Sequence, residues 1–247
     1  MIAVILAAGK SKRMNSSVSK VLLPLHGRPM LWYILSTAKR LKPDRILIVV
    51  GKNGDKIRDH FGKEGIEFVE QPQPLGTADA VLRCKDYLNN PEEDVVILCG
   101  DVPLLSEKTL RNLVETYYKE KADVALLTAE VENPKGYGRI VRRETGEVDR
   151  IVEEREATEE IRRIREINSG VYVFKAKSLL RTLKRIRPSK RTGEYYLTDV
   201  IAEIIREQGR AISVITPDSI EIKGVNTPED FAFVKEVMKE RWEFLKD

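Results

Sequence analysis

Residues 1–20 read MIAVILAAGKSKRMNSSVSK, and this stretch decides the fold class. The apolar run over residues 2–7 is rich in β-branched side chains, which favours a strand buried on both faces of a parallel sheet. It ends at Ala8 and Gly9, whose small side chains let another molecule approach the backbone. Four cations follow, at Lys10, Lys12, Arg13 and Lys20. Because open α/β sheets bind ligands at the carboxyl ends of their strands, we expect this loop to hold a polyphosphate.

Two common phosphate-binding loops do not fit these residues. A P-loop needs a glycine five residues before the glycine of its GK[ST], and Val4 stands at that distance from Gly9. A dinucleotide fingerprint GxGxxG would need glycines where Ser11 and Met14 stand. The sequence therefore indicates a phosphate loop of another kind.

Strand patterns alternate with helical periods in the first half of the chain. Strands are expected over residues 45–50, 66–69 and 94–99, and helices over residues 29–41, 55–61, 78–88 and 107–118. This alternation predicts an α/β fold with a Rossmann-like, doubly wound sheet.

Strands dominate after residue 122, which predicts a mixed sheet with a small antiparallel β addition. The expected strands cover residues 123–130, 139–142, 148–152, 167–174, 212–215 and 220–223, and helices are expected over residues 177–187 and 197–207. A last helix follows Thr227 as N-cap and Pro228 as first helical residue. We expect one domain over residues 1–227 and a C-terminal helix over residues 228–247. The apolar stripe of that helix is expected to pack on its own domain, with a homo-oligomer contact as the alternative.

Composition limits the partners and the compartment. The 43 Lys and Arg residues nearly balance 39 Asp and Glu, so the net charge of +4 does not indicate nucleic-acid binding. No run approaches the roughly 20 apolar residues of a membrane span, so no membrane contact is expected. Cys84 and Cys99 lack the spacing of a zinc site or a disulfide framework, which fits a cytoplasmic protein.

Residues 98–104, LCGDVPL, place Asp101 directly after a predicted buried strand. A carboxylate at that edge suits Mg²⁺, which is commonly bound by one or two carboxylates together with substrate phosphates. Asp101 is therefore a predicted metal ligand. The alternative is an Asp that caps the following helix.

Residues 71–78, QPQPLGTA, join a predicted strand to the next helix. The amide of Gln71 has a donor and an acceptor that suit an imide edge such as that of uracil, and Gly76 would let a base lie on the backbone. The alternative is a Pro-rich turn with Thr77 as N-cap. Four further positions have plain structural alternatives: a hairpin turn at Gly138, surface charge at Glu153, a satisfied buried amide at Asn168 and a turn at Asn226.

Taken together, the motifs resemble one family, the bacterial N-acetylglucosamine-1-phosphate uridylyltransferases among the sugar-phosphate nucleotidyltransferases. They are LAAGKSKRM with the later Lys20, QPQPLGTADA, CGDVPL, GYGRI, IVEE, EINSGVYVF, GEYYLTD and GVNTPED, in the family order from residue 2 to about residue 230. Three positions depart from the pattern: Ser11 replaces a Gly, Ser19 a Pro and Cys99 a frequent Tyr. No hexapeptide repeat is present, so the acetyltransferase β-helix of related enzymes, and its acetyl transfer, are not expected here.

The resemblance implies a Mg²⁺-dependent reaction in which UTP and N-acetylglucosamine 1-phosphate give UDP-N-acetylglucosamine and pyrophosphate. It implies nucleotide contacts from Leu6, Ala7, Ala8, Gly9, Lys20, Gln71, Gly76, Thr77 and Gly100, and sugar contacts from Gly138, Glu153, Asn168 and Asn226. It also implies catalytic roles for Arg13 and Lys20, and metal ligation by Asp101 and Asn226. Two alternatives stay open: the same chemistry on another pair, such as glucose 1-phosphate with UTP or dTTP, and a catalytically silent sugar-nucleotide-binding protein.

Overall fold

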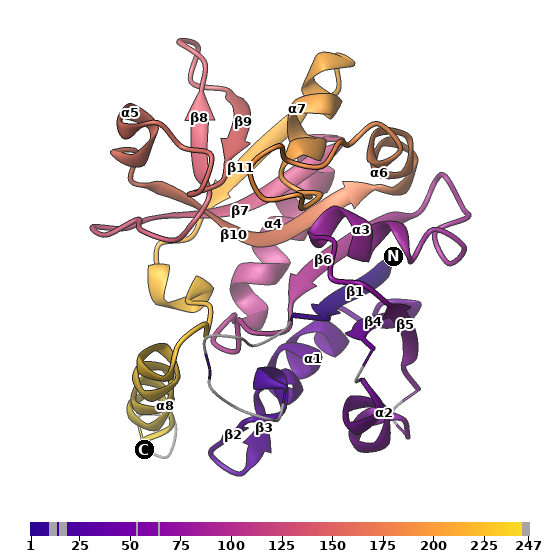
Figure 1. Ribbon diagram of the computed structural model, residues 1–247, viewed down its shortest axis with the longest axis vertical. Helices are drawn as coiled ribbons and strands as arrows, with labels where there is room; N and C mark the ends of the chain where they lie inside the picture. The colour runs from indigo at the N-terminus through magenta and orange to yellow at the C-terminus, as the bar shows by residue number, and fades with distance from the viewer. Residues whose placement is uncertain (10–13, 15–18, 53, 64, 244–247) are drawn as a thin grey trace.

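A computed structural model describes residues 1–9, 14, 19–52, 54–63 and 65–243. Its main feature is a mixed sheet in the strand order β11-β7-β10-β6-β1-β4-β5 (Figure 1). The strands are β1 (Ile2–Ala7), β4 (Arg45–Gly51), β5 (Glu67–Gln71), β6 (Asp94–Cys99), β7 (Val124–Glu130), β10 (Glu166–Lys175) and β11 (Ala211–Ile215). β1 is parallel to β4 and β6, whereas β10 runs antiparallel to β6 and β7.

Helices cover both faces of the sheet, as the alternating pattern predicts. One face packs against α1 (Met30–Arg40), α2 (Asp55–Phe61) and α4 (Glu107–Lys119), and the other against α3 (Thr77–Leu82), α6 (Ala176–Leu183) and α7 (Asp199–Arg206). β1 shows why two cores form: Ala3 and Ile5 enter one, and Ile2 and Val4 enter the other. The doubly wound α/β fold is therefore confirmed.

The order in which strands are added to the sheet reverses at β1, and this reversal determines where the site lies. β4 and β6 flank β1, and the helices α1 and α3 that lead toward them lie on opposite faces. The register pairs Leu6 with Cys99 and Ala7 with Val50, so the carboxyl ends of these strands lie at one edge. Such a switch point is where ligands of open α/β sheets bind.

The expected antiparallel addition is a ribbon of β8 (Arg139–Arg142) and β9 (Val148–Val152), with the short helix α5 (Glu159–Arg162) beside it. β8 also pairs with β10, which ties the ribbon to the main sheet.

Two expected elements differ in the structure. The strand predicted over residues 220–223 is wrong, because Ser219–Ile222 is a 3₁₀ helix, η3. Asp218 accepts a hydrogen bond from the backbone N–H of Ile220 at 3.1 Å, and this local bond caps a helical turn in place of a strand. The helix predicted over residues 78–88 ends as α3 at Leu82 and continues only as turns.

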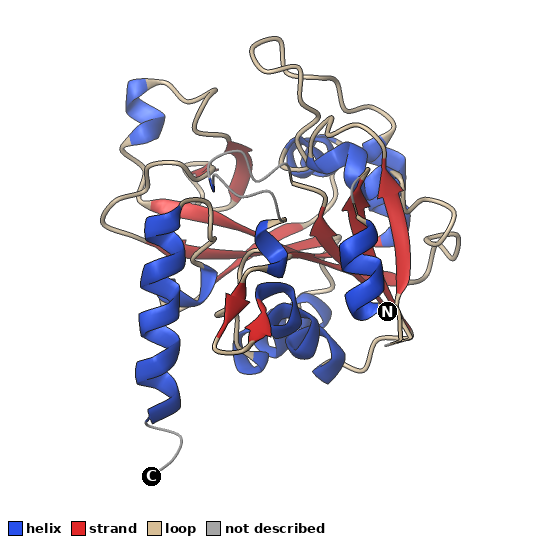
Figure 2. Cartoon of the chain, turned by 60° about the horizontal axis from the view of Figure 1, so that its bottom comes forward, coloured by secondary structure: helices blue, strands red, loops and turns tan. Residues whose placement is uncertain are grey.

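The C-terminal helix α8 (Pro228–Glu243) begins as expected after Thr227, whose hydroxyl accepts from the backbone N–H of Asp230 at 3.2 Å. Its buried side chains, Val234 and Met238, pack against Leu25 of β2 (Pro24–Leu25). β2 pairs with β3 (Arg28–Pro29), and this short hairpin lies beside the helix (Figure 2). This face of the helix is thus covered by its own chain. Within the described ranges, no helix has the length and apolarity to cross a membrane.

Candidate active site

A cleft of about 670 Å³ opens at the edge where β1, β5 and β6 end. Most of the predicted site residues line it: Leu6, Ala7, Ala8, Gly9, Lys20, Gln71, Gly76, Thr77, Asp101, Glu153 and Asn226. Gly100, Gly138 and Asn168 are not among its lining residues. Arg13, predicted to be catalytic, lies outside the described residues, as do Lys10 and Lys12.

Gly100 lies behind the cleft and serves packing. Its backbone N–H donates to the carbonyl of Leu6 at 2.9 Å. A Cβ at this position would lie 3.0 Å from that carbonyl oxygen and 3.2 Å from Leu31. The glycine therefore lets the ends of β1 and β6 approach each other, and its nucleotide contact stays a prediction.

Three segments that are distant in sequence meet at Lys20, the first residue of the 3₁₀ helix η2 (Lys20–Leu22). Its ammonium donates to the carboxylate of Asp101 at 2.5 Å and to the side-chain oxygen of Asn226 at 2.9 Å. A third bond, also 2.9 Å, reaches the carbonyl of Val225. The ion pair is largely buried, since the side chains of Lys20 and Asp101 are 12% and 22% exposed. The two predicted metal ligands thus converge on one cation.

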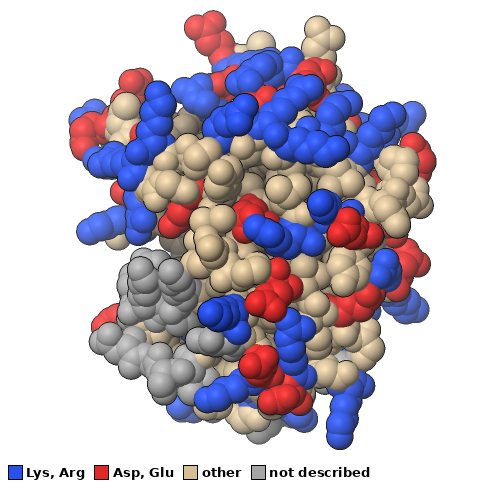
Figure 3. Space-filling model, turned by 45° about the vertical axis from the view of Figure 1, so that its right-hand side comes forward, with Lys and Arg blue, Asp and Glu red and all other residues tan. Residues whose placement is uncertain are grey.

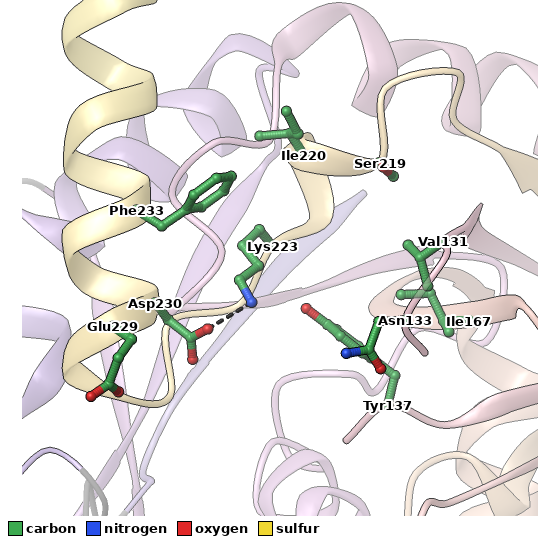
Figure 4. A pocket seen from close by; sticks show the side chains of 10 residues that line it. All are labelled: Val131, Asn133, Tyr137, Ile167, Ser219, Ile220, Lys223, Glu229, Asp230 and Phe233. Carbon is green, nitrogen blue, oxygen red and sulfur yellow. Dashed lines mark ion pairs between the residues drawn. The ribbon is translucent and has the colours of Figure 1, made fainter. Parts of the chain in front are cut away.

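Asn226 is held in place by the start of α8. The carboxylate of Asp230 accepts the backbone N–H groups of Asn226 and Thr227, each at 3.0 Å. Lys223 pairs with the same carboxylate at 2.6 Å, beside a second hollow of about 320 Å³ that Figure 4 shows from close by. Tyr137 points its hydroxyl toward Lys223 across this hollow. The cap that begins the helix therefore also positions a site residue.

Gln71, Gly76 and Thr77 form the opposite wall of the cleft. Gln71 ends β5 and is buried, and its amide N–H₂ donates to the carbonyl of Gly76 and to the carboxylate of Asp79, both at 2.9 Å. The hydroxyl of Thr77 does not cap α3. It accepts the backbone N–H of Leu197 at 2.9 Å and so joins this wall to the segment before α7.

Glu153 follows β9 and contributes an acidic group to the cleft. Its carboxylate accepts from the hydroxyl of Thr198 at 2.9 Å. Burial raises the pKa of Glu153, and the nearby carboxylates of Asp199, Glu194 and Glu156 act in the same direction.

Gly138 and Asn168 lie just beyond the lining residues, next to Glu153. The backbone N–H of Asn168 donates to the carbonyl of Gly138 at 2.9 Å, and a Cβ at Gly138 would lie 3.6 Å from Glu153. The Asn168 amide donates to the hydroxyl of Tyr172 at 2.7 Å, so this half-buried polar group has a partner. These contacts place both predicted sugar residues at the Glu153 end of the cleft.

The loop that carries Gly138 is fixed by a buried ion pair. Arg139, only 1% exposed, donates to the carboxylate of Glu154 at 2.8 Å, and Glu154 also accepts the backbone N–H of Gly136 at 3.0 Å. The arginine of the GYGRI motif thus supports the loop from behind and does not enter the cleft.

A family model described as the MobA-like NTP transferase domain matches residues 3–203 of the chain. The chain belongs to this family. The match covers every strand that ends at the cleft, together with Lys20, Gln71 and Asp101.

Bacterial relatives confirm the family resemblance of the motifs. The chain is 43% identical over 247 residues to "Bifunctional protein GlmU" of Aquifex aeolicus, covering 97% of this chain and 53% of the relative. The protein of the same name from Oceanobacillus iheyensis is 40% identical, with coverages of 97% and 52%. For that of Desulfotalea psychrophila the identity is 37%, with coverages of 96% and 70%. The chain thus spans about half the length of most curated relatives it matches.

A solved structure shows the same fold. A protein from Bacillus anthracis, assigned as a glucose-1-phosphate thymidylyltransferase and crystallised with sucrose, superposes with a TM-score of 0.74 at 20% identity. The superposition covers 96% of this chain and 95% of the other. It supports the sheet order and the nucleotidyltransferase type of architecture.

Nucleotidyltransferases of this family generally use a divalent metal, and the donor set at Lys20 fits one. Asp101 and Asn226 offer a carboxylate and an amide oxygen that already surround a cation, and hard divalent ions prefer oxygen ligands. The parts of the chain that the structure describes hold no group of three or more His, Cys, Asp or Glu able to bind a metal.

Sequence reasoning missed Arg155, Glu194 and Tyr196 as cleft residues. Glu194 and Tyr196 lie in the GEYYLTD motif, so the motif itself was the signal that could have identified them. Arg155 stands in a charged run that looks like ordinary surface. Cys99 also lines the cleft, but burial raises its pKa to about 12, which argues against a nucleophilic role.

The basic residues are less evenly spread than the net charge suggests. Figure 3 shows Lys and Arg side chains gathered over the upper part of one face. A hollow of about 460 Å³ is lined by basic residues of α6 and the turn after it, Lys177, Arg181, Lys184 and Arg185. Arg181 and Arg185 both pair with Glu207, so part of this charge is already neutralised.

Proposed function

We propose that this chain transfers the uridylyl group of UTP to N-acetylglucosamine 1-phosphate, which gives UDP-N-acetylglucosamine and pyrophosphate. The observation that carries the proposal is the convergence of Lys20, Asp101 and Asn226 in a cleft that residues 6–9 also line. This arrangement combines a cation, oxygens of the kind that bind metals, and small residues at the switch point of the sheet. Those are the features that phosphoryl and nucleotidyl transfer require.

The reaction needs positioning and charge stabilisation more than proton transfer. The phosphate oxygen of the sugar phosphate already carries a negative charge, so it can attack the α-phosphorus of UTP without a general base. The bond to the leaving pyrophosphate breaks as the new P–O bond forms. Lys20, which lines the cleft, is proposed to neutralise charge that develops on the phosphates.

Mg²⁺ is the proposed metal, with Asp101 and Asn226 as its protein ligands. When bound, it would supply Lewis-acid stabilisation of the phosphate oxygens. The same side-chain oxygens now accept hydrogen bonds from Lys20, so the ion and the ammonium compete for them. We infer that Lys20 turns from these oxygens toward the substrate phosphates when the metal binds.

The remaining roles follow from position in the cleft. Gln71, Gly76 and Thr77 are proposed to hold the uracil end, and Leu6, Ala7, Ala8 and Gly9 to contact the nucleotide through their backbone. Glu153, with Gly138 and Asn168 beside it, is proposed to hold the acetamido sugar. Arg13, which follows β1 in the sequence and lies outside the described residues, remains a proposed catalytic residue.

The test is release of pyrophosphate across a matrix of nucleotides and sugar phosphates. UTP, dTTP and CTP are each combined with N-acetylglucosamine 1-phosphate and glucose 1-phosphate. We expect UTP with N-acetylglucosamine 1-phosphate to give the highest kcat/KM. A preference for glucose 1-phosphate, or for dTTP, would move the proposal to another sugar nucleotide, and no turnover with any pair would overturn it.

A separate variant tests the proposed role of Asp101 as a metal ligand. Asp101→Asn removes the carboxylate but keeps the size of the side chain, and we expect turnover at millimolar Mg²⁺ to fall on the order of 10²-fold. Asp59→Asn makes the same change on the exposed side of α2 and serves as the control, with normal turnover expected. Near-normal activity of Asp101→Asn would exclude this carboxylate from the reaction.

A further inference from the structure

Gln71 has a fixed orientation in the cleft. Its amide nitrogen has two hydrogens, and these are donated to the carbonyl of Gly76 and to the carboxylate of Asp79. Both partners are acceptors. If the amide were flipped, its oxygen would face two other oxygens, so the chemistry of the neighbours decides which end of the amide points where.

The carboxylate of Asp79 is itself fixed in position by an ion pair with Arg83. Asp79 is the third residue of α3 and is 8% exposed, and its second carboxylate oxygen accepts from the guanidinium of Arg83, one turn later, at 2.8 Å. Both carboxylate oxygens of Asp79 therefore accept hydrogen bonds, one from Gln71 and one from Arg83. Arg83, Asp79 and Gln71 thus form a chain of donors and acceptors that ends at the cleft wall.

These hydrogen bonds occupy the amide nitrogen of Gln71, so the side-chain oxygen of Gln71 is the group available to a ligand. Among the residues that the structure describes, none donates to this oxygen, although Gln71 is 4% exposed and lines the cleft. An acceptor that lines the cleft and has no donor from the protein can take a hydrogen bond from a ligand that brings an N–H or O–H group to it.

We propose that Asp79, supported by Arg83, is a specificity-determining residue that makes Gln71 accept a hydrogen bond from the base and so selects pyrimidines with an N3–H group. The inference rests on the proposed function in one respect: the proposed function places the base at the cleft wall that Gln71 forms. Uracil and 5-methyluracil carry a hydrogen on N3, whereas the N3 of cytosine is an acceptor. If cytosine bound here, its N3 and the fixed side-chain oxygen of Gln71 would be two acceptors facing each other. Asp79 is a positioning residue, since it acts through Gln71.

The test compares three nucleotides that share ribose and triphosphate: UTP, 5-methyl-UTP and CTP, each with the preferred sugar phosphate. For the unmodified protein we expect kcat/KM to favour UTP over CTP by ~10²-fold or more, because a site built around a hydrogen bond rejects the analogue that lacks it. 5-Methyl-UTP keeps the N3–H group, so the Asp79–Gln71 pair does not discriminate against it.

Asp79→Asn is the informative variant. Arg83 would hold the new amide by its oxygen, which turns the amide nitrogen toward Gln71 and removes one of the two acceptors that fix its orientation. We expect the ratio of kcat/KM for UTP to kcat/KM for CTP to fall about tenfold or more. A tenfold fall corresponds to the loss of ~1.4 kcal/mol of discrimination between the two nucleotides. The ratio of UTP to 5-methyl-UTP should not change.

The UTP to CTP ratio and the UTP to 5-methyl-UTP ratio together separate a loss of base specificity from a general loss of activity. A merely structural role of Asp79 would lower kcat/KM for all three nucleotides by the same factor. Asp59→Asn is the charge-matched control on α2, and Arg83→Gln leaves the Asp79 carboxylate in place and should affect the UTP to CTP ratio less than Asp79→Asn does.

Each outcome decides the inference. A collapse of the UTP to CTP ratio with an unchanged 5-methyl-UTP ratio supports it, and an unchanged UTP to CTP ratio in a folded Asp79→Asn overturns it. If Asp79→Asn does not fold, dissociation constants of UMP and CMP for the unmodified protein provide the second measurement, and equal affinities overturn the inference. The absence of turnover with any nucleotide in the unmodified protein would contradict the proposed function instead.

Discussion

Single residues of the cleft are kept in unfavourable surroundings, and Glu153 shows this best. Burial raises its pKa above the ordinary value of 4.5, although the hydrogen bond from Thr198 acts in the opposite direction. Between pH 4.5 and the raised pKa, the folded protein holds a proton that the unfolded chain has lost. The stability contributed by this group therefore falls as the pH rises through that window, and it is lost completely above the raised pKa.

This sign gives a prediction for Glu153→Gln. The glutamine can still accept from Thr198 but never ionises, so we expect the variant to have a free energy of unfolding ~1 kcal/mol above that of the unmodified protein at pH 8. The difference should shrink as the pH falls toward 4.5. Urea unfolding at a series of pH values measures it. A gain that is absent at pH 8, or that grows in acid, would contradict the assigned sign.

Places in the cleft were easiest to predict where a side chain follows a strand of the sheet. Asp101 and Gln71 were found in this way, because the end of a buried strand fixes the place of the next polar group. Gly100 shows the limit: its place in the motif gave no sign that its missing side chain leaves room for the carbonyl of Leu6 and the side chain of Leu31. The orientation of Gln71 also needed coordinates, because it depends on Asp79 eight residues away.

At the scale of elements, the cleft depends on a turn that joins two distant segments. The segment of residues 71–78 pairs with the segment before α7: the backbone N–H of Tyr195 donates to the carbonyl of Leu75 at 2.7 Å, and that of Ala78 to the carbonyl of Tyr195 at 2.9 Å. Gly76 lies between them with a φ of +114°, and a Cβ there would lie 2.7 Å from the backbone nitrogen of Tyr195. Only glycine fits this position.

Gly76→Ala should therefore lower the free energy of unfolding by about 3 kcal/mol, the sum of backbone strain and a clash with a backbone that cannot move aside. Gly146→Ala is the matched control, since Gly146 also has a positive φ, of +85°, but open space around it. It should cost ~1 kcal/mol from strain alone. Equal losses for the two variants in urea unfolding would show that the docking of Tyr195 against Gly76 does not matter.

Elements with a strong local pattern were predictable, and elements set by distant partners were not. β6, β8, β9 and α2 were expected with the bounds that the structure gives them, because apolar periodicity and flanking turn residues define them locally. Residues 220–223 have an apolar alternation that predicts a strand. There Asp218 caps a turn, and Glu221 accepts from the hydroxyl of Ser106 at 3.0 Å, so contacts outside the segment decide its form.

At the scale of the whole molecule, the fold gathers at one edge groups that the chain keeps far apart. Lys20 and Asn226 are 206 residues apart, and Lys20 and Asp101 are 81 apart. Local patterns predict strands and helices, but the meeting of these side chains depends on β1 lying between β4 and β6 and on the cap that starts α8. The family resemblance indicated which residues belong together, and the sheet order explains why they meet.

The central claim is that Asp101 and Asn226 hold the divalent ion of a nucleotidyl transfer. The most direct measurement is an anomalous difference map from crystals grown with Mn²⁺ and UDP-N-acetylglucosamine. We predict one strong peak about 2.2 Å from the side-chain oxygens of Asp101 and Asn226, with the Lys20 ammonium turned away from both. A peak at another place in the cleft, or bound sugar nucleotide with Lys20 still bridging Asp101 and Asn226 and no metal between them, would contradict the account.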